Sequence, residues 1–219
     1  MKQYILKLEL ISPALIGSGE GFGAIIDTDI VFDEVGIPYI PAKRIKGCLR
    51  DSAMEIREML NSSGISFPVE TEKAFGKPGD SKSAPVYFSN LTIDNYEDNK
   101  KCLEYFLKSG EYNDILSRER ILETFTETRQ QTRIGLDGVA YDHSLRTIRV
   151  IKKDTTFYGD IFIEEKDDED IINTLLFGCL NFCHIGTKRN RGFGEVRCIL
   201  LDKSGTEIPI QDKLEKICT

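Results

Sequence analysis

A run of alternating glycines followed by spaced aspartates is the first feature of this sequence that could do chemistry. The stretch GSGEGFGAIIDTDIVF covers residues 17–32, and its glycines are Gly17, Gly19, Gly21 and Gly23. Backbone without side chains can approach a phosphate closely, and a carboxylate beside a phosphate can bind Mg²⁺ or accept a proton. Because mostly β-branched and aromatic residues follow, we expect a strand after the glycines, and the dinucleotide-binding pattern G-x-G-x-x-A is excluded.

Three carboxylates in this region are candidates for catalysis or metal binding. Asp27, Asp29 and Asp33 occupy odd positions of the segment 25–33. In an extended segment they would share one face, and the apolar residues between them would take the other. Plain solvent exposure explains that pattern, and spacing alone favours it over a functional role.

Basic residues are concentrated in three islands, although the chain carries a formal net charge of −7. The islands cover residues 43–50, 146–153 and 188–197. Local patches decide whether a surface binds a polyanion, so an acidic protein with such islands can still bind RNA or DNA. For any one island taken alone, a solvated surface is the simpler explanation.

The third island lies in the glycine-rich stretch GTKRNRGFG, residues 186–194, which contains Lys188, Arg189 and Arg191. Backbone amides of such a loop can bind phosphates while its side chains supply positive charge. An ordinary flexible loop is nearly as good an interpretation.

The cysteines and histidines favour structural roles. Cys179 and Cys183 lie four residues apart on a predicted helix, but no familiar zinc-binding spacing is present. We therefore expect reduced cysteines in the core, without disulfides. His143 and His184 lack neighbours of the kind that mark a nucleophile pair, and we interpret both as structural.

The elements that must position these residues follow from periodicity and turn signals. Strands are predicted at 4–10, 25–33, 85–93, 145–151, 156–163 and 195–201, and helices at 43–61, 99–124 with a break near Ser109 and Gly110, and about 168–183. Residues 126–142 are polar, contain Arg129 and Arg133, and predict an exposed hairpin or arm. The order predicts an α+β domain of ferredoxin-like (RRM-like) type with insertions.

Composition bounds the class of protein. A chain of 219 residues, 40% of them apolar, favours one domain with its own core. Apolar runs are too short to span a bilayer, and charges interrupt the N-terminal apolar residues, unlike a signal peptide. We therefore expect a cytoplasmic protein that does not associate with a membrane.

The stretch LISPALIGSGEGFGAIIDTDIVFDEVGIPYIPAKRIKGCLR, followed far downstream by IGTKRNRGFGEV, resembles the RAMP superfamily, the repeat-associated proteins of CRISPR-Cas systems. More narrowly, it is similar to the backbone subunit of type III effector complexes. The motif residues are Ile26-Asp27, the Pro-Tyr-Ile-Pro of 38–41, Lys46-Gly47 and Arg50. Residues 126–150 resemble the family's thumb, a β-hairpin arm that reaches over the guide RNA.

This resemblance implies one RAMP domain over residues 1–219, with insertions at about 62–84, 94–124 and 126–144. It implies guide RNA (crRNA) and complementary target RNA as ligands, and other effector subunits, including other RAMP proteins, as partners in antiviral defence. The residues expected to bind RNA are Gly17, Gly19, Gly21, Gly23, Lys43, Lys46, Arg50, Arg129, Arg133, Lys188, Arg189 and Arg191. Shape and charge recognition suits a guide of variable sequence.

The resemblance also implies a metal-dependent endoribonuclease. Asp27 would lie beside the scissile phosphate with a divalent metal ion, Mg²⁺ in our expectation, and without an organic cofactor; the ribose 2′-hydroxyl would be the nucleophile. Whether Asp27 or Asp29 is the active carboxylate, and whether it binds metal or accepts a proton, stays open at this stage.

Two other functions remain possible. The chain could be a binding module with an inert aspartate, whose partner subunit cuts the RNA. It could also be a guide-RNA processing endoribonuclease that uses a histidine, an alternative that explains the glycine loop but not Ile26-Asp27 or residues 38–41.

Overall fold

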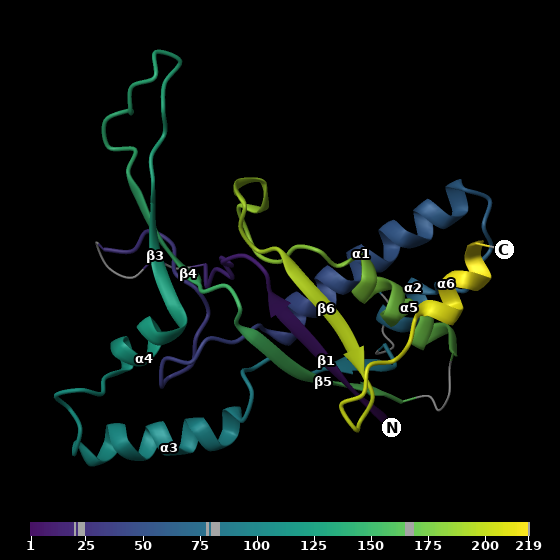
Figure 1. Ribbon diagram of the computed structural model, residues 1–219, viewed down its shortest axis with the longest axis horizontal. Coiled ribbons are helices and arrows are strands. Elements are labelled where there is room, and N and C mark those ends of the chain that lie inside the picture. The colour runs from purple at the N-terminus through teal and green to yellow at the C-terminus, as the bar shows by residue number, and fades with distance from the viewer. Residues whose placement is uncertain (20, 22–24, 78, 80–83, 165–168, 219) are drawn as a thin grey trace.

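The computed structural model describes residues 1–19, 21, 25–77, 79, 84–164 and 169–218, and Gly23 lies outside them. Within this part of the chain, four strands form an antiparallel sheet in the order β2-β5-β1-β6. The strands are β1 (Lys2–Leu10), β2 (Val86–Phe88), β5 (Thr156–Ile163) and β6 (Val196–Leu201). The fold is therefore a mixed α/β arrangement built on antiparallel strands (Figure 1).

One face of this sheet makes the core with two helices, α1 (Ala42–Ser62) and α5 (Glu169–Asn181). The alternation in β1 buries Tyr4, Leu6, Leu8 and Leu10, which join Ile45 and Leu49 of α1 and Leu175 of α5 in one apolar cluster. The two helices approach closely at Gly178, where a Cβ atom would lie 3.3 Å from the carbonyl oxygen of Leu49. The helix predicted at 43–61 is confirmed, and its N-terminal half is fixed by this packing.

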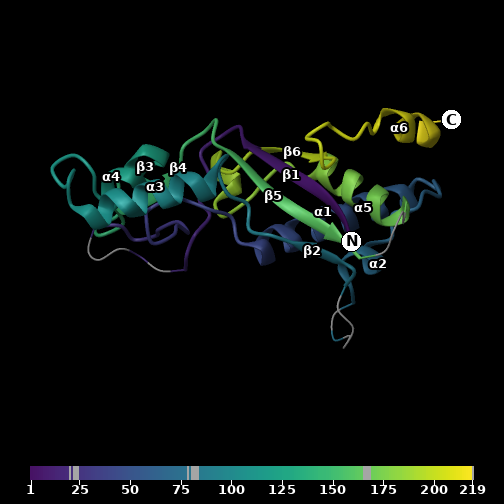
Figure 2. The same ribbon diagram turned by 90° about the horizontal axis from the view of Figure 1, so that it is seen from below.

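A second, smaller β-ladder forms the protruding arm. β3 (Thr126–Gln131) pairs antiparallel with β4 (Arg146–Ile151), and the chain between them continues the arm to its tip. α3 (Tyr96–Ser109) and α4 (Arg118–Phe125) precede the arm, and α4 ends where β3 begins. Figure 2 shows the base of the arm, α3 and α4 at one end of the sheet, with α2 (Thr71–Phe75) and α6 (Gln211–Cys218) at the other.

Several predicted elements need correction. Residues 25–33 do not form a regular strand, because successive residues pair with different segments: Thr28 bridges Ile148, Ile30 bridges Gly17 and Phe32 bridges Pro38. The strand predicted at 85–93 is shorter, Val86–Phe88. The strand predicted at 145–151 is present as β4 and pairs with β3 in the arm. The predicted break between helices is confirmed at Gly110, which has φ 69°.

The cysteines divide between core and surface. Cys179 and Cys198 are 4% and 8% exposed, as the core interpretation predicts, whereas Cys183 is exposed. Burial raises the pKa of the Cys198 thiol, and its neighbour Cys179 adds to that effect. Among the described helices, none has the combination of length and apolar character needed to cross a membrane.

Candidate nucleic-acid interface

Asp27 lies at the base of the arm and is bonded to the outer edge of β4. Its backbone N–H donates to the carbonyl oxygen of Thr147 at 2.8 Å, and its Oδ2 accepts from the Thr147 N–H at 2.7 Å. Arg146 places Nη1 3.5 Å from Oδ1. The side chain remains 40% exposed, so the structure holds this carboxylate in a defined position at the surface.

The expectation that the three aspartates share one exposed face is wrong, because Asp29 and Asp33 are 4% and 8% exposed. The Asp29 carboxylate accepts from Arg149 Nη1 at 2.9 and 3.2 Å and from the Ile30 N–H at 2.8 Å. A buried carboxylate needs such partners, since an unpaired buried charge is strongly unfavourable. Burial and pairing leave Asp29 poorly placed to meet a phosphate.

Asp33 closes a turn. Its Oδ1 accepts from the backbone N–H groups of residues 35–37 at 2.8 to 3.0 Å, and its Oδ2 accepts from the Tyr96 hydroxyl at 2.9 Å. These bonds account for both oxygens of the carboxylate. Of the three aspartates, Asp27 is thus the one that the structure presents to solvent.

A pocket of about 880 Å³ opens along the arm, and one of its lining residues, Arg146, lies 3.5 Å from the Asp27 carboxylate. Its lining residues are Gln131, Thr132, Arg133, Ile134, Tyr141, Asp142, His143, Ser144, Arg146, Lys188 and Arg191. The Arg133 guanidinium lies 4.9 Å from the centroid of the Tyr141 ring. The pocket combines several cations with an aromatic ring, a combination that suits nucleic acid.

The glycine-rich loop reaches this pocket because its glycines let it pack on the body. Gly186 and Gly194 have φ 83° and 78°, and a Cβ atom on either would collide with a backbone carbonyl, that of Leu15 or of Ile185. Lys188 itself has φ 61°, a conformation that non-glycine residues adopt rarely. The loop is therefore held in shape by its contacts with the body and not left free around a phosphate.

The cations of this loop divide between two surfaces. Lys188 Nζ donates to Gln131 Oε1 at 2.6 Å, and Arg191 Nη1 donates to the same oxygen at 3.3 Å. Arg189 faces away from the arm: its Nε donates to the Gly186 carbonyl, and it lines another pocket together with Cys48 of α1. The loop thus connects the base of the arm with α1.

The surroundings of Lys188 shift its pKa. Burial and then the positive charge of Arg191 lower the pKa of Lys188, while the negative charge of Asp27 acts in the opposite direction. These interactions place Lys188 within electrostatic reach of both Arg191 and Asp27. Loop, arm and carboxylate therefore form one site.

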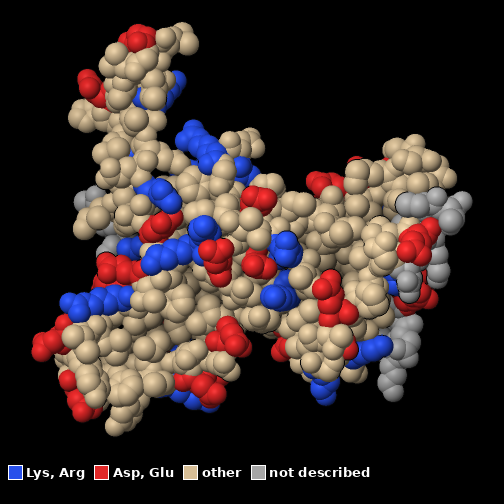
Figure 3. Space-filling view, in the orientation of Figure 1, with Lys and Arg blue, Asp and Glu red and all other residues tan. Residues whose placement is uncertain are grey.

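The predicted stripe on α1 forms a neighbouring basic surface. Burial and the charge of Arg50 lower the pKa of Lys46, so these side chains lie close together, and Lys43 is exposed. Arg44, which the sequence analysis did not assign, donates from Nη2 to the Gly17 carbonyl at 2.9 Å. Figure 3 shows Lys and Arg side chains, interspersed with Asp and Glu, in the region between the arm and the body.

The remaining predicted residues have other surroundings. Gly17 bridges Ile30, and Gly19 has open space around it. At Gly21 a Cβ atom would lie 2.7 Å from the Ile26 carbonyl oxygen, so this glycine permits a tight return of the chain. Arg129 pairs with Glu127 at 2.6 Å along the arm.

Several pocket residues were missed by sequence reasoning, above all Arg146, Gln131 and Tyr141. Arg146 belongs to a basic island that the sequence displays, but its contact with Asp27 joins positions 119 residues apart in the chain. His143 also lines the pocket and has φ 57°. No local sequence pattern predicts that these residues line the pocket.

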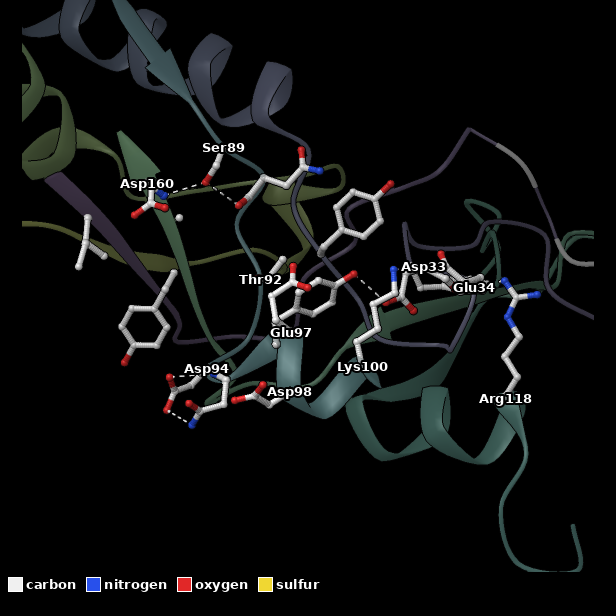
Figure 4. A pocket seen from close by; sticks show the side chains of 18 residues that line it. Asp33, Glu34, Ser89, Thr92, Asp94, Glu97, Asp98, Lys100, Arg118 and Asp160 are labelled. Atoms are coloured by element: carbon white, nitrogen blue, oxygen red, sulfur yellow. Dashed lines mark hydrogen bonds and ion pairs between the residues drawn. The ribbon is translucent and has the colours of Figure 1, made fainter. Parts of the chain in front are cut away.

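A larger cavity, about 1020 Å³, lies between α3 and the sheet (Figure 4). Its carboxylates are Asp33, Glu34, Asp94, Glu97, Asp98 and Asp160, and its cations are Lys100 and Arg118. Lys100 lies 2.6 Å from Glu34, which raises the pKa of Lys100, and Arg118 Nη2 donates to the Asp33 carbonyl at 3.2 Å. The excess of acid makes this cavity unsuitable for a polyanion, although it is larger than the arm pocket.

The protein supplies few ligands for a divalent ion near Asp27. Across the described ranges, no group of three or more His, Cys, Asp or Glu side chains lies close enough together to hold a metal ion. Mg²⁺ is commonly bound through one or two carboxylates, water and the phosphates of the substrate. Asp27 supplies one such carboxylate, so a bound ion would depend on RNA phosphates for further ligands.

Comparisons with known proteins agree on the fold. A cryo-EM structure of the Type III-B Cmr-beta bound to cognate target RNA contains a similar chain, with TM-score 0.64 and 15% identity over 90% of this chain and 97% of that one. A chain in the apo state of Type III-B Cmr-beta gives TM-score 0.64 and 14% identity over 92% and 98% of the two chains. A comparison with curated proteins finds no match.

The family match covers the features that form the site. The family model of the RAMP superfamily matches residues 7–197, a span that includes the glycine segment, Asp27, the arm and the loop at 186–194. With that span matched, and with the fold shared with the Cmr-beta chains, the sequence belongs to the RAMP superfamily.

Proposed function

We propose that this protein is an RNA-binding backbone subunit of a type III CRISPR effector complex, and that it cuts target RNA complementary to its guide. The observation that carries the proposal is the Asp27 carboxylate, fixed by Thr147 and 3.5 Å from Arg146, which lines a cationic pocket. The similar chains come from Cmr-beta structures, one of them bound to target RNA, which supports RNA as the ligand and other effector subunits as partners. A cytoplasmic location follows from this assignment.

The fold supports the same assignment. The strand order β2-β5-β1-β6, with α1 and α5 in the connections, is the arrangement expected of a ferredoxin-like (RRM-like) domain. We assign the β3–β4 arm as the thumb and the segments outside the sheet and its two helices as insertions. The proposed domain then spans the whole chain.

RNA binding would rest on phosphate contacts from the pocket and the adjoining basic surface. Lys188, Arg191 and Arg146 supply positive charge beside Asp27, and Tyr141 offers a ring on which a base can stack. Such contacts carry no base information, so sequence would be left to pairing between guide and target. The protein would accordingly accept guides of any sequence.

For cutting, the 2′-hydroxyl of the target would lose its proton and form a bond to the adjacent phosphorus, while the bond to the 5′-oxygen breaks; the products would be a 2′,3′-cyclic phosphate and a 5′-hydroxyl that takes its proton from water. The Thr147 N–H orients the Asp27 carboxylate by binding Oδ2, while Lys188 and Arg146 stabilise the negative charge that develops on the phosphate oxygens. Asp27 would accept the hydroxyl proton or hold Mg²⁺. When bound, Mg²⁺ would supply charge neutralisation at the phosphate.

A non-catalytic binding subunit is the second candidate. The observation that favours it is the contact between Arg146 and Asp27 at 3.5 Å, because Arg146 and the Thr147 N–H together engage both oxygens of the carboxylate. The pocket would then bind RNA for a partner subunit to cut.

The decisive experiment compares Asp27→Ala, Asp27→Asn and His143→Ala in the assembled complex. We expect both Asp27 variants to keep guide and target affinity but lose cutting of complementary RNA, and His143→Ala to cut normally. Undiminished cutting with Asp27→Ala would remove the catalytic assignment and favour the binding subunit. Loss of cutting with His143→Ala instead would favour the histidine-dependent alternative.

A further inference from the structure

The segment that carries Asp27 adds a short parallel piece to the outer edge of β4. Thr28 forms a parallel bridge with Ile148, and the Arg149 N–H donates to the Thr28 carbonyl oxygen at 3.1 Å. The Asp27 N–H, which donates to the Thr147 carbonyl oxygen, continues this ladder, and the Thr147 N–H donates to the Asp27 side chain at Oδ2. Residues 27–28 therefore belong to the arm by hydrogen bonding, although they lie far from it in sequence.

The next residue joins this segment to the arm by charge. The side chains of Arg149 and Asp29 are 15% and 6% exposed, and their closest atoms lie 2.9 Å apart. Asp29 Oδ1 also accepts from the Ile30 N–H at 2.8 Å. Removing one partner of such a pair leaves a buried charge without compensation, so the pair strongly favours one placement of the segment against β4.

On its other side, the same segment is bonded to the body. The Ser18 N–H donates to the Asp29 carbonyl oxygen at 2.8 Å, and Gly17 bridges Ile30. Arg44 of α1 in turn donates to the Gly17 carbonyl at 2.9 Å. Asp29 thus lies at the joint between the body and the arm, two residues from the candidate catalytic carboxylate.

We propose that Asp29 and Arg149 form a positioning pair that keeps the Asp27 carboxylate in register with the arm, so that arm and carboxylate meet RNA as one unit. The inference rests on the proposed function for the catalytic role of Asp27. It assigns Asp29 to positioning, in place of metal binding or proton transfer. Substitution of either partner should release Asp27 without removing a group that touches RNA.

The first test needs no cutting activity. Amide hydrogen exchange is measured on the isolated chain with Asp29→Asn, which keeps an acceptor for the Ile30 N–H but loses the charge, and with Arg149→Lys, which keeps the charge but loses the planar geometry. We expect exchange of the Thr147 amide, bonded to Asp27, to accelerate about tenfold or more, while the β1 amides of Leu6 and Leu8 keep their protection.

The second test measures target cutting in the assembled complex under single-turnover conditions. Asp29→Asn should lower the cutting rate about a hundredfold through misplacement of Asp27, with target affinity within about twofold of the unmodified complex. Arg149→Lys should restore part of the rate lost in Arg149→Met. Tyr96→Phe is the matched control, because it removes a hydrogen bond to a buried carboxylate of the same segment, Asp33, on the side away from the arm.

The two tests distinguish a failure of the Asp29–Arg149 positioning pair from a failure of the proposed cutting function. Unchanged Thr147 exchange in Asp29→Asn would overturn the positioning pair, and so would equal losses of cutting in Asp29→Asn and Tyr96→Phe. If the unmodified complex fails to cut target RNA, the catalytic function is lost, and the exchange measurement still decides whether Asp29 and Arg149 hold Asp27 to the arm.

Discussion

Lys188 donates a 2.6 Å hydrogen bond from its ammonium group to the amide oxygen of Gln131, which joins the glycine-rich loop to the end of β3. Arg191 donates to the same oxygen at 3.3 Å. A neutral side chain therefore sets the position of the charges that face the arm pocket. This relationship yields the first prediction.

Gln131→Ala should weaken RNA binding although it removes no charge. Without the amide oxygen, Lys188 and Arg191 lose their common acceptor, so RNA binding itself must order the two side chains. The free energy of RNA binding should become less favourable by on the order of 1 kcal/mol, about fivefold in affinity. Gln130→Ala, on the exposed neighbouring position of β3, is the control and should bind normally. Equal affinity of both variants, measured by fluorescence anisotropy, would contradict the prediction.

The α1 stripe can be tested by charge reversal. Lys46→Glu with Arg50→Glu should weaken binding to all RNA sequences alike, because phosphate contacts carry no base information. The slope of log affinity against log salt should fall by at least about 1.4, the contribution of two cations to single-stranded RNA. Lys101→Glu, exposed on α3, should leave both quantities unchanged. Unaltered affinity in the double variant at low salt would remove α1 from the RNA surface.

The lowered pKa of Lys188 predicts an early loss of RNA affinity as the pH rises. Lysine binds phosphate in its charged form, which persists below its pKa, so the contribution of Lys188 should fall at pH values where an ordinary lysine remains protonated. Lys188→Arg stays charged throughout and should flatten the profile at pH values below the ordinary lysine pKa of about 10.4. A 2′-O-methyl RNA withstands these pH values. Superimposable profiles of the two proteins would show that Lys188 does not titrate in this range.

The tip of the arm can be shortened without loss of the core. Leu136 and Val139 are 110% and 63% exposed, and a bridge between Ile134 and Ala140 closes the tip. Replacing residues 134–140 by a two-residue Asn-Gly turn should change the free energy of unfolding by less than about 1 kcal/mol, since exposed side chains contribute little to stability.

The same shortened chain should assemble poorly with its partner subunits, because exposed apolar side chains on a protruding element mark contact surfaces. Thermal unfolding of the chain and size-exclusion chromatography of the co-expressed complex measure the two effects. A large fall in the unfolding temperature would show instead that the tip supports the core. Leu136→Ser serves as the milder variant for assembly.

Local periodicity was enough to predict β1 and α1, because a strand or helix that buries one face displays that face in its sequence. The basic island at 146–153 shows what periodicity leaves out. Arg146 approaches Asp27, Arg149 pairs with Asp29, and Lys152 donates to the carbonyl oxygens of Glu123 and Thr124 at the end of α4.

The sequence therefore showed that residues 146–153 are basic, but it did not show that each basic side chain has a different partner. The burial of Asp29 follows from a partner 120 positions away, and no spacing within residues 25–33 contains that information. Arg149 compensates the unfavourable burial of the Asp29 carboxylate, and only the fold brings these two residues together. The resemblance assigned catalysis to Asp27 and left Asp29 as the alternative, and tertiary structure separates the two by burial and pairing.

The ladder of the arm ends with the pair Gln131 and Arg146, one residue of which anchors the loop while the other faces Asp27. Lengthening both strands by one residue below this pair would turn both side chains to the opposite face and detach them from their partners. Lengthening by two restores the faces but carries the pair about 7 Å along the arm, out of reach of Lys188 and Asp27. Relatives that vary the reach of this arm should therefore place their insertions between this pair and the tip.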